Sequence, residues 1–432
     1  MRPGGQERVR LNASYDGQFP IRRTNTSTEE GREELTEGQV LGAVTISHTS
    51  QHFFQGAGIL QQSMIDALRL DYTQIGIMNG LLNVFGVLPI LYSVLSRRWS
   101  RRLLLGGSNM LMGLGCILTG AADRFVFVLG GASASGIGQA GVHPMSSSII
   151  TDKYRAKRIG AALSVFFGIG YVGNIVSPLL LSWVASLYGY RAAYYLLGLI
   201  PIATGALILV SLRREPAAGL SVAERKNRNL RRDIVSSLRV PGVVAVLVAY
   251  GFVSAGTGLG VLSTWVPLFL RSPKGLNEPI LAAGIVSALG TIGGVVGTIY
   301  LGRVAEKRGY LRVTMFSLAV TTSMILCLSL YTSFSLLIIP NLFLLSFTTF
   351  SLTSLMQAHL MSVAGPSERD ILSGLFFAVG AGVSAIWSTL LGFLIDRYTF
   401  SVVWLTMGAS GILALFLLLY AYRRSRPRPA TR

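Results

Sequence analysis

The chain has 432 residues, of which 51% are hydrophobic and only 13% are charged, and its formal net charge is +19. A soluble domain carries roughly 25% charged residues, so this composition excludes an ordinary soluble fold and predicts an all-α membrane protein. The basic residues concentrate in short loops between apolar runs, a pattern that reports membrane topology and argues against nucleic-acid binding.

The chain begins with a polar segment, residues 1–39, that lacks the apolar stretch of a signal peptide and is predicted to be a disordered cytoplasmic tail. Twelve apolar runs of about 20 residues follow, and each is predicted to be a transmembrane helix. The runs cover residues 40–62, 74–95, 103–121, 125–147, 159–185, 191–212, 243–269, 280–301, 313–331, 334–358, 371–395 and 400–422. The first run is the least apolar of the twelve, because several histidines and glutamines interrupt it.

Arginines and lysines gather in the loops after the second, fourth, sixth, eighth and twelfth runs, at residues 97–102, 153–158, 213–239, 303–312 and 423–432, whereas the loop after the tenth run is not net basic. Loops after odd-numbered runs are short and nearly neutral. The positive-inside rule therefore predicts that both termini are cytoplasmic. We expect a multi-pass protein of the bacterial inner membrane, monomeric, with anionic lipids bound at its basic loops.

The longest internal polar segment, residues 213–242, lies near the middle of the chain and is predicted to be a basic cytoplasmic linker. It separates two predicted six-helix bundles, residues 40–212 and 243–422, and residues 423–432 form a basic cytoplasmic tail. The two halves echo each other, since the segment around Gln139 and His143 resembles the one around Gln357 and His359. Pseudo-symmetric bundles of this kind are typical of transporters that bind a solute near the bilayer midplane.

Two loop motifs give the chain a resemblance to the major facilitator superfamily that covers about residues 40–422. The second loop, Gly302 to Arg312, is similar to the family signature G-x-x-x-D-R-x-G-R/K-R, with Glu306 at the acidic position. The first loop, Ser93 to Arg102, keeps the basic residues but has Arg97 where the family has the acid. The glycine- and proline-bearing run from Gly160 to Pro178 also looks like the fifth span of the family.

In that family the acidic residue helps to lock the outward-facing state, so the resemblance implies a gating role for the loop residues and leaves the first loop without its lock. The gating residues implied are Arg98, Arg101, Arg102, Gly302, Glu306, Lys307, Arg308, Gly309 and Arg312. A narrower resemblance, carried by His48, His52, residues 70–76 and His143-Pro144, is to the branch with fosmidomycin-resistance-type exporters.

The resemblance implies that the first, fourth, seventh and tenth runs line a central cavity, and all four histidines lie in these runs or at their ends. His48 and His52 are four residues apart and share a helix face, which favours a role for them in the site. His143 precedes Pro144 and could equally bond carbonyls that the proline frees, and His359 is expected to be structural. The predicted substrate-binding residues are His48, Gln51, His52, Gln55, Gln139, His143, Tyr250, Thr257, Trp265 and Gln357.

No Asp or Glu lies in the middle of a predicted helix, so any proton coupling is expected to use a histidine or co-transport with an anionic substrate. His48 and His52 have the spacing of metal ligands, but no carboxylate or cysteine accompanies them, so no metal site is predicted. The chain has no Walker motif and no paired catalytic set, and we expect neither a cofactor nor an enzymatic activity.

The predicted function is secondary transport of a small solute by alternating access, coupled to an ion or to protons. Efflux and organic-anion uptake both remain open. The alternative is a transporter-fold membrane sensor or regulator that does not transport.

Overall fold

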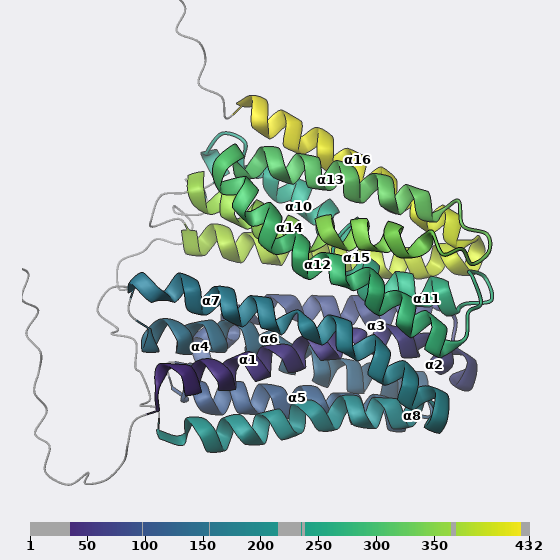
Figure 1. The fold of residues 1–432 in the computed structure, drawn as a ribbon, viewed down its shortest axis with the longest axis horizontal. Helices are drawn as coiled ribbons and strands as arrows, with labels where there is room; N and C mark the ends of the chain where they lie inside the picture. Colours follow the sequence, from purple (N-terminus) through teal and green to yellow (C-terminus); the bar gives the residue numbers. More distant parts are fainter. Residues whose placement is uncertain are drawn as a thin grey trace, which may run out of the picture. The chain divides into compact units, whose positions relative to one another are not determined.

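The computed structural model describes residues 35–96, 98–154, 156–214, 235, 238–363 and 369–424, and the secondary structure in this part of the chain is helical (Figure 1). Within it, nine helices are long and apolar enough to cross a membrane, or ten if one bent pair is counted as a span. The membrane fold is therefore confirmed, whereas the predicted count of twelve is not reached by length and composition.

The helices of the first half and their short 3₁₀ connections are α1 (Glu37–Phe54), η1 (Gln55–Leu60), α2 (Gln61–Leu68), α3 (Tyr72–Val84), η2 (Phe85–Val87), α4 (Pro89–Leu95), α5 (Arg101–Ala121), α6 (Phe125–Lys153), α7 (Ala156–Gly170), α8 (Val172–Ser211) and η3 (Leu212–Arg214). Those of the second half are α10 (Val243–Gly256), the π-helical turn η5 (Val261–Trp265), α11 (Val266–Arg271), α12 (Ile280–Arg308), α13 (Tyr310–Leu328), α14 (Ile338–Val363), α15 (Arg369–Arg397) and α16 (Phe400–Arg424).

Two local features explain the difference between ten and twelve. The first predicted run becomes α1 and η1, and its polar side chains keep α1 outside the set of apolar spans. The fifth and sixth runs appear as one continuous span of 47 residues, from Val165 to Ser211. Gly189 interrupts that span with a φ of 82°, a left-handed conformation that glycine adopts without steric cost, so the chain turns there as the sequence predicted.

The start of α1 is defined by a capping box at Thr36, whose side chain accepts a hydrogen bond from the backbone N–H of Gln39. Helix α1 therefore begins at Glu37, three residues before the predicted boundary. Most of the predicted tail, the linker and the C-terminal tail lie outside the described residues, and the domain boundaries stay a prediction.

Small residues set the packing inside each half. Helix α5 packs mainly against α6 and α8, and α12 packs mainly against α14. A methyl group added at Gly293 of α12 would overlap the backbone carbonyl of Phe343 on α14. Such close approach of backbones is the usual way in which membrane helices associate, because lipid tails provide no hydrophobic drive between them.

The two halves meet chiefly along α3 with α15 and along α8 with α12 (Figure 1). We call the side where α1 begins and α16 ends the terminal face, and the side that carries the turn between α2 and α3 the distal face. At the distal face, Asp396 of α15 accepts hydrogen bonds from the backbone N–H groups of Tyr72 and Thr73, at 3.0 and 2.7 Å, and from the Thr73 hydroxyl at 2.6 Å. These bonds join the first turn of α3 to the end of α15.

Candidate functional site

A cavity of about 330 Å³ lies between the two halves, within the range of ~300–1,000 Å³ typical of small-molecule sites. Its walls come from α1 with η1, α2, α3, α5, α6 and α8 on one side, and from α10, η5, α14 and α15 on the other. A solute in this cavity would therefore contact both halves of the protein.

The lining is polar but uncharged. Five residues with amide side chains line the cavity: Gln55, Gln61, Asn79, Asn83 and Gln139. Ten residues with hydroxyl side chains also line it: Thr119, Ser135, Tyr194, Tyr250, Ser254, Ser263, Thr264, Thr353, Ser384 and Ser388. The hydroxyls of Thr119, Ser135 and Ser263 donate to backbone carbonyls of the protein. Phe54 and Trp265 add aromatic surface, and no Asp, Glu, Lys, Arg or His is among the described residues of the wall. Amides and hydroxyls both donate and accept hydrogen bonds, so this wall suits a solute that does the same.

Some of these amides are already paired. Gln61 Nε2 donates to Asn79 Oδ1 at 3.2 Å, and Asn83 Nδ2 donates to the hydroxyl of Ser388 at 3.2 Å, which links α3 to α15. Gln139 is half-buried and has no hydrogen-bond partner within the described part of the chain. Its amide is therefore the one in the wall best placed to bond a solute directly.

Four of the ten predicted substrate-binding residues line this cavity: Gln55, Gln139, Tyr250 and Trp265. Two others lie elsewhere and bond within the protein. The Thr257 hydroxyl donates to the carbonyl of Val253, and Gln357 Nε2 donates to the Ser373 hydroxyl at 3.2 Å.

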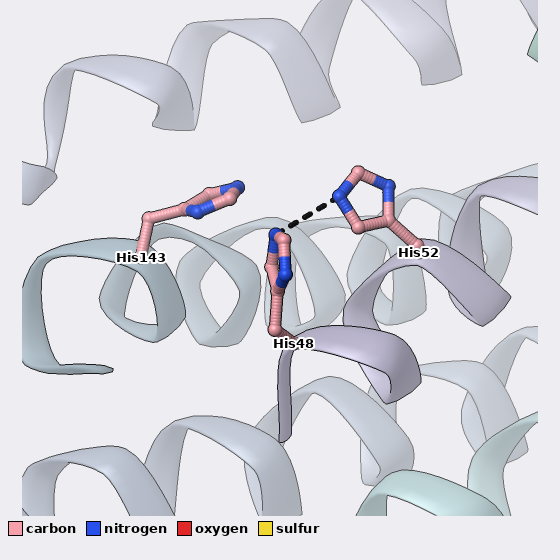
Figure 2. A group of neighbouring side chains, drawn as sticks. All are labelled: His48, His52 and His143. Carbon is pink, nitrogen blue, oxygen red and sulfur yellow. Dashed lines mark hydrogen bonds between the residues drawn. The ribbon is translucent and has the colours of Figure 1, made fainter. Parts of the chain in front are cut away.

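Gln51 is buried on α1 and is not part of the cavity wall. The remaining three predicted residues, His48, His52 and His143, come together as a separate cluster (Figure 2). His52 lies three residues before Gln55, and His143 lies four residues after Gln139, so the cluster is about one helical turn from the cavity.

Several residues of the wall were missed by the sequence reasoning. Asn79 and Asn83 lie four residues apart on α3, and Ser384 and Ser388 lie four apart on α15. A pair of polar residues at this spacing occupies one face of a helix, so the amide pair in an apolar run was a readable signal.

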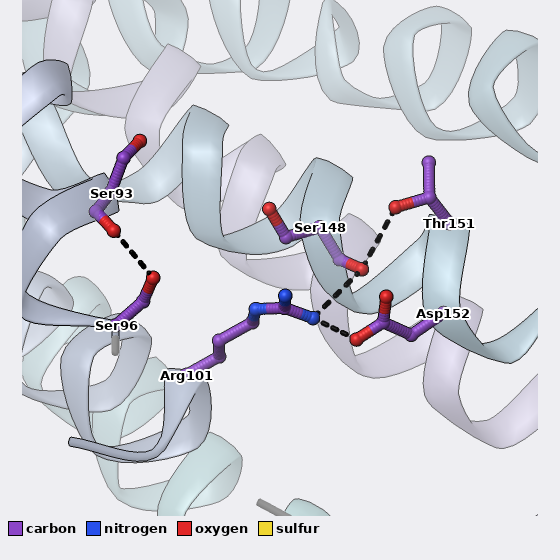
Figure 3. A network of polar contacts seen from close by, with 6 residues as sticks. All are labelled: Ser93, Ser96, Arg101, Ser148, Thr151 and Asp152. Carbon is purple, nitrogen blue, oxygen red and sulfur yellow. Dashed lines mark hydrogen bonds and ion pairs between the residues drawn. The ribbon is translucent and has the colours of Figure 1, made fainter. Parts of the chain in front are cut away.

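One predicted gating residue of the first loop, Arg101, is held by contacts within the first half (Figure 3). Arg101 is buried and its guanidinium forms an ion pair with Asp152 at the end of α6, while also donating to the carbonyl of Ser148. Arg102 donates to the carbonyl of Leu209 at 3.5 Å, and Arg98 is exposed. The first loop has Arg97 at the acidic position of the family signature. Arg101 instead pairs with the carboxylate of Asp152 on the neighbouring helix α6.

The second loop is more open. Glu306, Lys307 and Arg308 are exposed at the end of α12, and Gly309 has a φ of 92° where the chain turns into α13. Gly302 is half-buried with open space around its Cα. Arg312 Nε donates to the hydroxyl of Tyr422 on α16 at 2.7 Å.

Two further hydrogen bonds join the halves at the distal face. The hydroxyls of Tyr72 and Ser272 share a short hydrogen bond, and Arg271 Nη2 donates to the hydroxyl of Ser63 at 3.3 Å. Within the second half, Lys274 Nζ donates to the carbonyls of Ile395 and Asp396, at 2.7 and 2.9 Å. Among the described residues, the hydrogen bonds that join the two halves all lie between the level of Asn83 and the distal face.

Comparison with known proteins gives one consistent result. The family model described as Major Facilitator Superfamily matches residues 44–389. The chain is 28% identical over 356 residues to the transcription regulatory protein OpdE of Pseudomonas aeruginosa, and the alignment covers 79% of this chain and 83% of that protein. It is 24% identical over 416 residues to the fosmidomycin resistance protein of Escherichia coli, covering 92% and 96%.

Among solved structures, a bacterial homolog of the human lysosomal transporter Spinster, in an inward-facing and unoccupied conformation, has a TM-score of 0.69 at 15% identity. The alignment covers 92% of this chain and 100% of that structure. At this identity the likeness concerns the fold.

Proposed function

This chain belongs to the Major Facilitator Superfamily, and from that premise we propose that it is a secondary transporter of a small, uncharged, hydrogen-bonding solute. The family match and the helices make it an integral, multi-pass membrane protein. The observation that carries the proposed substrate class is the cavity between the halves, with its five amides and ten hydroxyls.

The charge of the wall decides between solute classes. A carboxylate or phosphonate moved from water into this cavity would lose its hydration shell and meet no counter-charge among the described wall residues. Burial of an unpaired ion costs several kcal/mol, whereas a neutral solute replaces its water hydrogen bonds with those of the amides and hydroxyls. This balance favours an uncharged solute over the organic anion that the sequence left open.

The contacts between the halves support alternating access. Asp396, Tyr72 and Thr73 hold the distal face closed, and the hydrogen bonds between the halves in the described part of the chain do not extend beyond Asn83 toward the terminal face. We propose that release of the distal contacts opens the cavity to the other side of the membrane. The direction of net transport and the coupling ion stay predictions, as does a proton-carrying role for the histidines.

The test of substrate class uses matched pairs of solutes, each a neutral compound and its acid: a hexose with its aldonate, and a nucleoside with its nucleotide. A ligand that binds only the folded protein increases the free energy of unfolding by mass action, by about 2.7 kcal/mol at one hundred times its dissociation constant, and so raises the thermal midpoint. We expect stabilisation of the purified protein by neutral members only. Stabilisation by the acids alone would refute the argument from wall charge.

Two glutamines provide a matched control, because they occupy corresponding places in the two halves. Gln139 lines the cavity and has no hydrogen-bond partner among the described residues, while Gln357 bonds Ser373 outside the cavity. Gln139→Leu should weaken binding of the neutral solute by about tenfold, the value of one hydrogen bond of ~1.4 kcal/mol, and Gln357→Leu should leave it unchanged. Equal effects of the two variants would show that the cavity is not the binding site.

A regulator without transport is the alternative, and it shares the prediction of binding. The two functions differ in flux: a transporter moves the bound solute into proteoliposomes, and a regulator of this fold binds it without uptake.

A further inference from the structure

Three histidines that are far apart in the sequence meet in the first half of the protein (Figure 2). His48 and His52 come from adjacent turns of α1, and His143 comes from α6. One ring nitrogen from each lies within 4.8 Å of the other two, and the Nε2 atoms of His48 and His52 are 3.0 Å apart. The three rings lie around a common centre (Figure 2).

The hydrogen bond of His48 defines its tautomer. Its Nδ1 lies 2.9 Å from the backbone carbonyl of Phe166, which can only accept, so Nδ1 carries the proton. The Nε2 atom of His48 therefore presents a lone pair to the centre of the cluster. Metal-binding histidines have this arrangement, in which one nitrogen binds the ion and the other donates to a carbonyl that fixes the ring.

The surroundings hold the rings in place. The imidazole of His48 stacks on Phe166 with the ring centroids 4.1 Å apart, and His52 lies 4.8 Å from the ring of Tyr171. A methyl group at Gly170 would overlap the His48 imidazole, so the absence of a side chain there makes room for the ring. His48 and His52 are buried, and His143 is partly exposed.

We propose that His48, His52 and His143 form a binding site for a divalent transition-metal ion such as Zn²⁺. Three imidazoles suit zinc, cobalt, nickel or copper, whereas calcium and magnesium require oxygen ligands. Zinc–nitrogen bonds of about 2.0–2.1 Å place the ligands of a tetrahedral ion roughly 3.3 Å apart. The observed separations are at most 4.8 Å, so the side chains would move closer by up to about 1.5 Å to reach this geometry.

An ion here would connect α1 to α6 about one turn from the solute cavity, since Gln55 directly follows α1 and Gln139 lies on α6. Three protein ligands leave the fourth position of a tetrahedral ion free for water. The sequence argued against a metal because no carboxylate or cysteine accompanies His48 and His52, and the fold supplies His143 as the third ligand. The site does not depend on the proposed substrate.

The test uses the full-length protein, purified without a polyhistidine tag, stripped with a chelator and titrated with Zn²⁺ by calorimetry. We expect one ion per chain. His143→Gln should weaken binding at least about tenfold, and His359→Gln, which changes the histidine of α14 outside the cluster, should bind as the unchanged protein does. No binding at protein concentrations in the micromolar range, or equal affinity of the unchanged protein and His143→Gln, would overturn the proposal.

Two further readouts separate loss of a ligand from loss of the fold. Co²⁺ bound by three imidazoles in a tetrahedral site gives intense visible absorption, which should disappear in His143→Gln. Gly170→Ala keeps all three histidines and displaces His48, so it should also weaken Zn²⁺ binding. Thermal midpoints of the stripped proteins identify any variant that is misfolded. A Co²⁺ spectrum unchanged in both variants would refute the three-histidine site.

Discussion

Replacement of Asp396 by alanine should open the distal face. The carboxylate of Asp396 accepts three hydrogen bonds from Tyr72 and Thr73 across the boundary between the halves. Two of the donors are backbone N–H groups in the first turn of α3, where the helix dipole also favours a negative charge. Asp396→Ala removes these contacts only in the closed state, so the equilibrium shifts toward the open one.

The size of the shift follows from these contacts. A hydrogen bond to a charged group contributes about 1.5–3 kcal/mol, and bonds to one carboxylate are not additive, so the net loss is about 2–4 kcal/mol. At 1.4 kcal/mol per factor of ten, this loss raises the open-to-closed ratio by roughly 30- to 700-fold. Thr73→Ala removes only the hydroxyl bond and should give a smaller increase.

Cysteine labelling measures the opening. Ser272 is fully buried at the distal face, beside Tyr72, so a Ser272→Cys thiol should react with a polar maleimide only when this face opens. The native cysteines, Cys116 and Cys327, are first replaced by serine. We expect Asp396→Ala to accelerate labelling until the intrinsic reaction rate limits it.

Asp71 provides the matched control. It is an exposed carboxylate on the same face, but its side chain caps its own helix by accepting from the N–H of Gln74. Asp71→Ala should leave the labelling rate nearly unchanged. An unaltered rate in Asp396→Ala, or an equal acceleration in both variants, would refute the assignment of Asp396 to closure.

Two further predictions concern stability. Asp152→Asn leaves the buried Arg101 without its carboxylate and should lower the free energy of unfolding in detergent by about 1–2 kcal/mol. Glu37→Gln, whose partner Arg158 is exposed, should lower it by less than about 1 kcal/mol. The reverse order would show that burial of Arg101 does not strengthen its ion pair. Gly293→Ala should lower the free energy of unfolding by about 1–3 kcal/mol, because the added methyl group forces α12 away from α14. Gly382→Ala, which has open space at its Cα, should not lower the thermal midpoint. Equal midpoints for the two glycine variants would contradict the close approach of α12 and α14.

The sequence predicted the membrane fold because its signals are local. Apolar runs and arginine-rich loops mark the helices, and Gly189 breaks α8 between the two runs predicted there. The prediction of the site was less complete, because tertiary contacts determine where each side chain bonds. Thr257 turns to a carbonyl of its own helix, and Gln357 turns to α15. The position of a residue in a predicted cavity-lining run does not show which hydrogen bonds its side chain forms.

The histidine cluster illustrates the same limit. The spacing of His48 and His52 was readable from the chain, but the approach of His143 depends on how α6 packs against α1. Asn79 and Asn83 in the cavity wall differ from His143, because their spacing of four residues places them on one helix face and can be read from the sequence. Polar pairs at i and i+4 in apolar helices are therefore as informative as histidines in a sequence of this kind.

The most direct test of the central claim is uptake into proteoliposomes that contain the purified protein, with each neutral solute and its acid supplied at equal concentration. We expect saturable uptake of a neutral solute that Gln139→Leu reduces and Gln357→Leu does not. Saturable uptake of the acids alone would contradict the uncharged substrate. Binding of a neutral solute without flux, in vesicles shown to hold folded protein, would contradict the transporter itself.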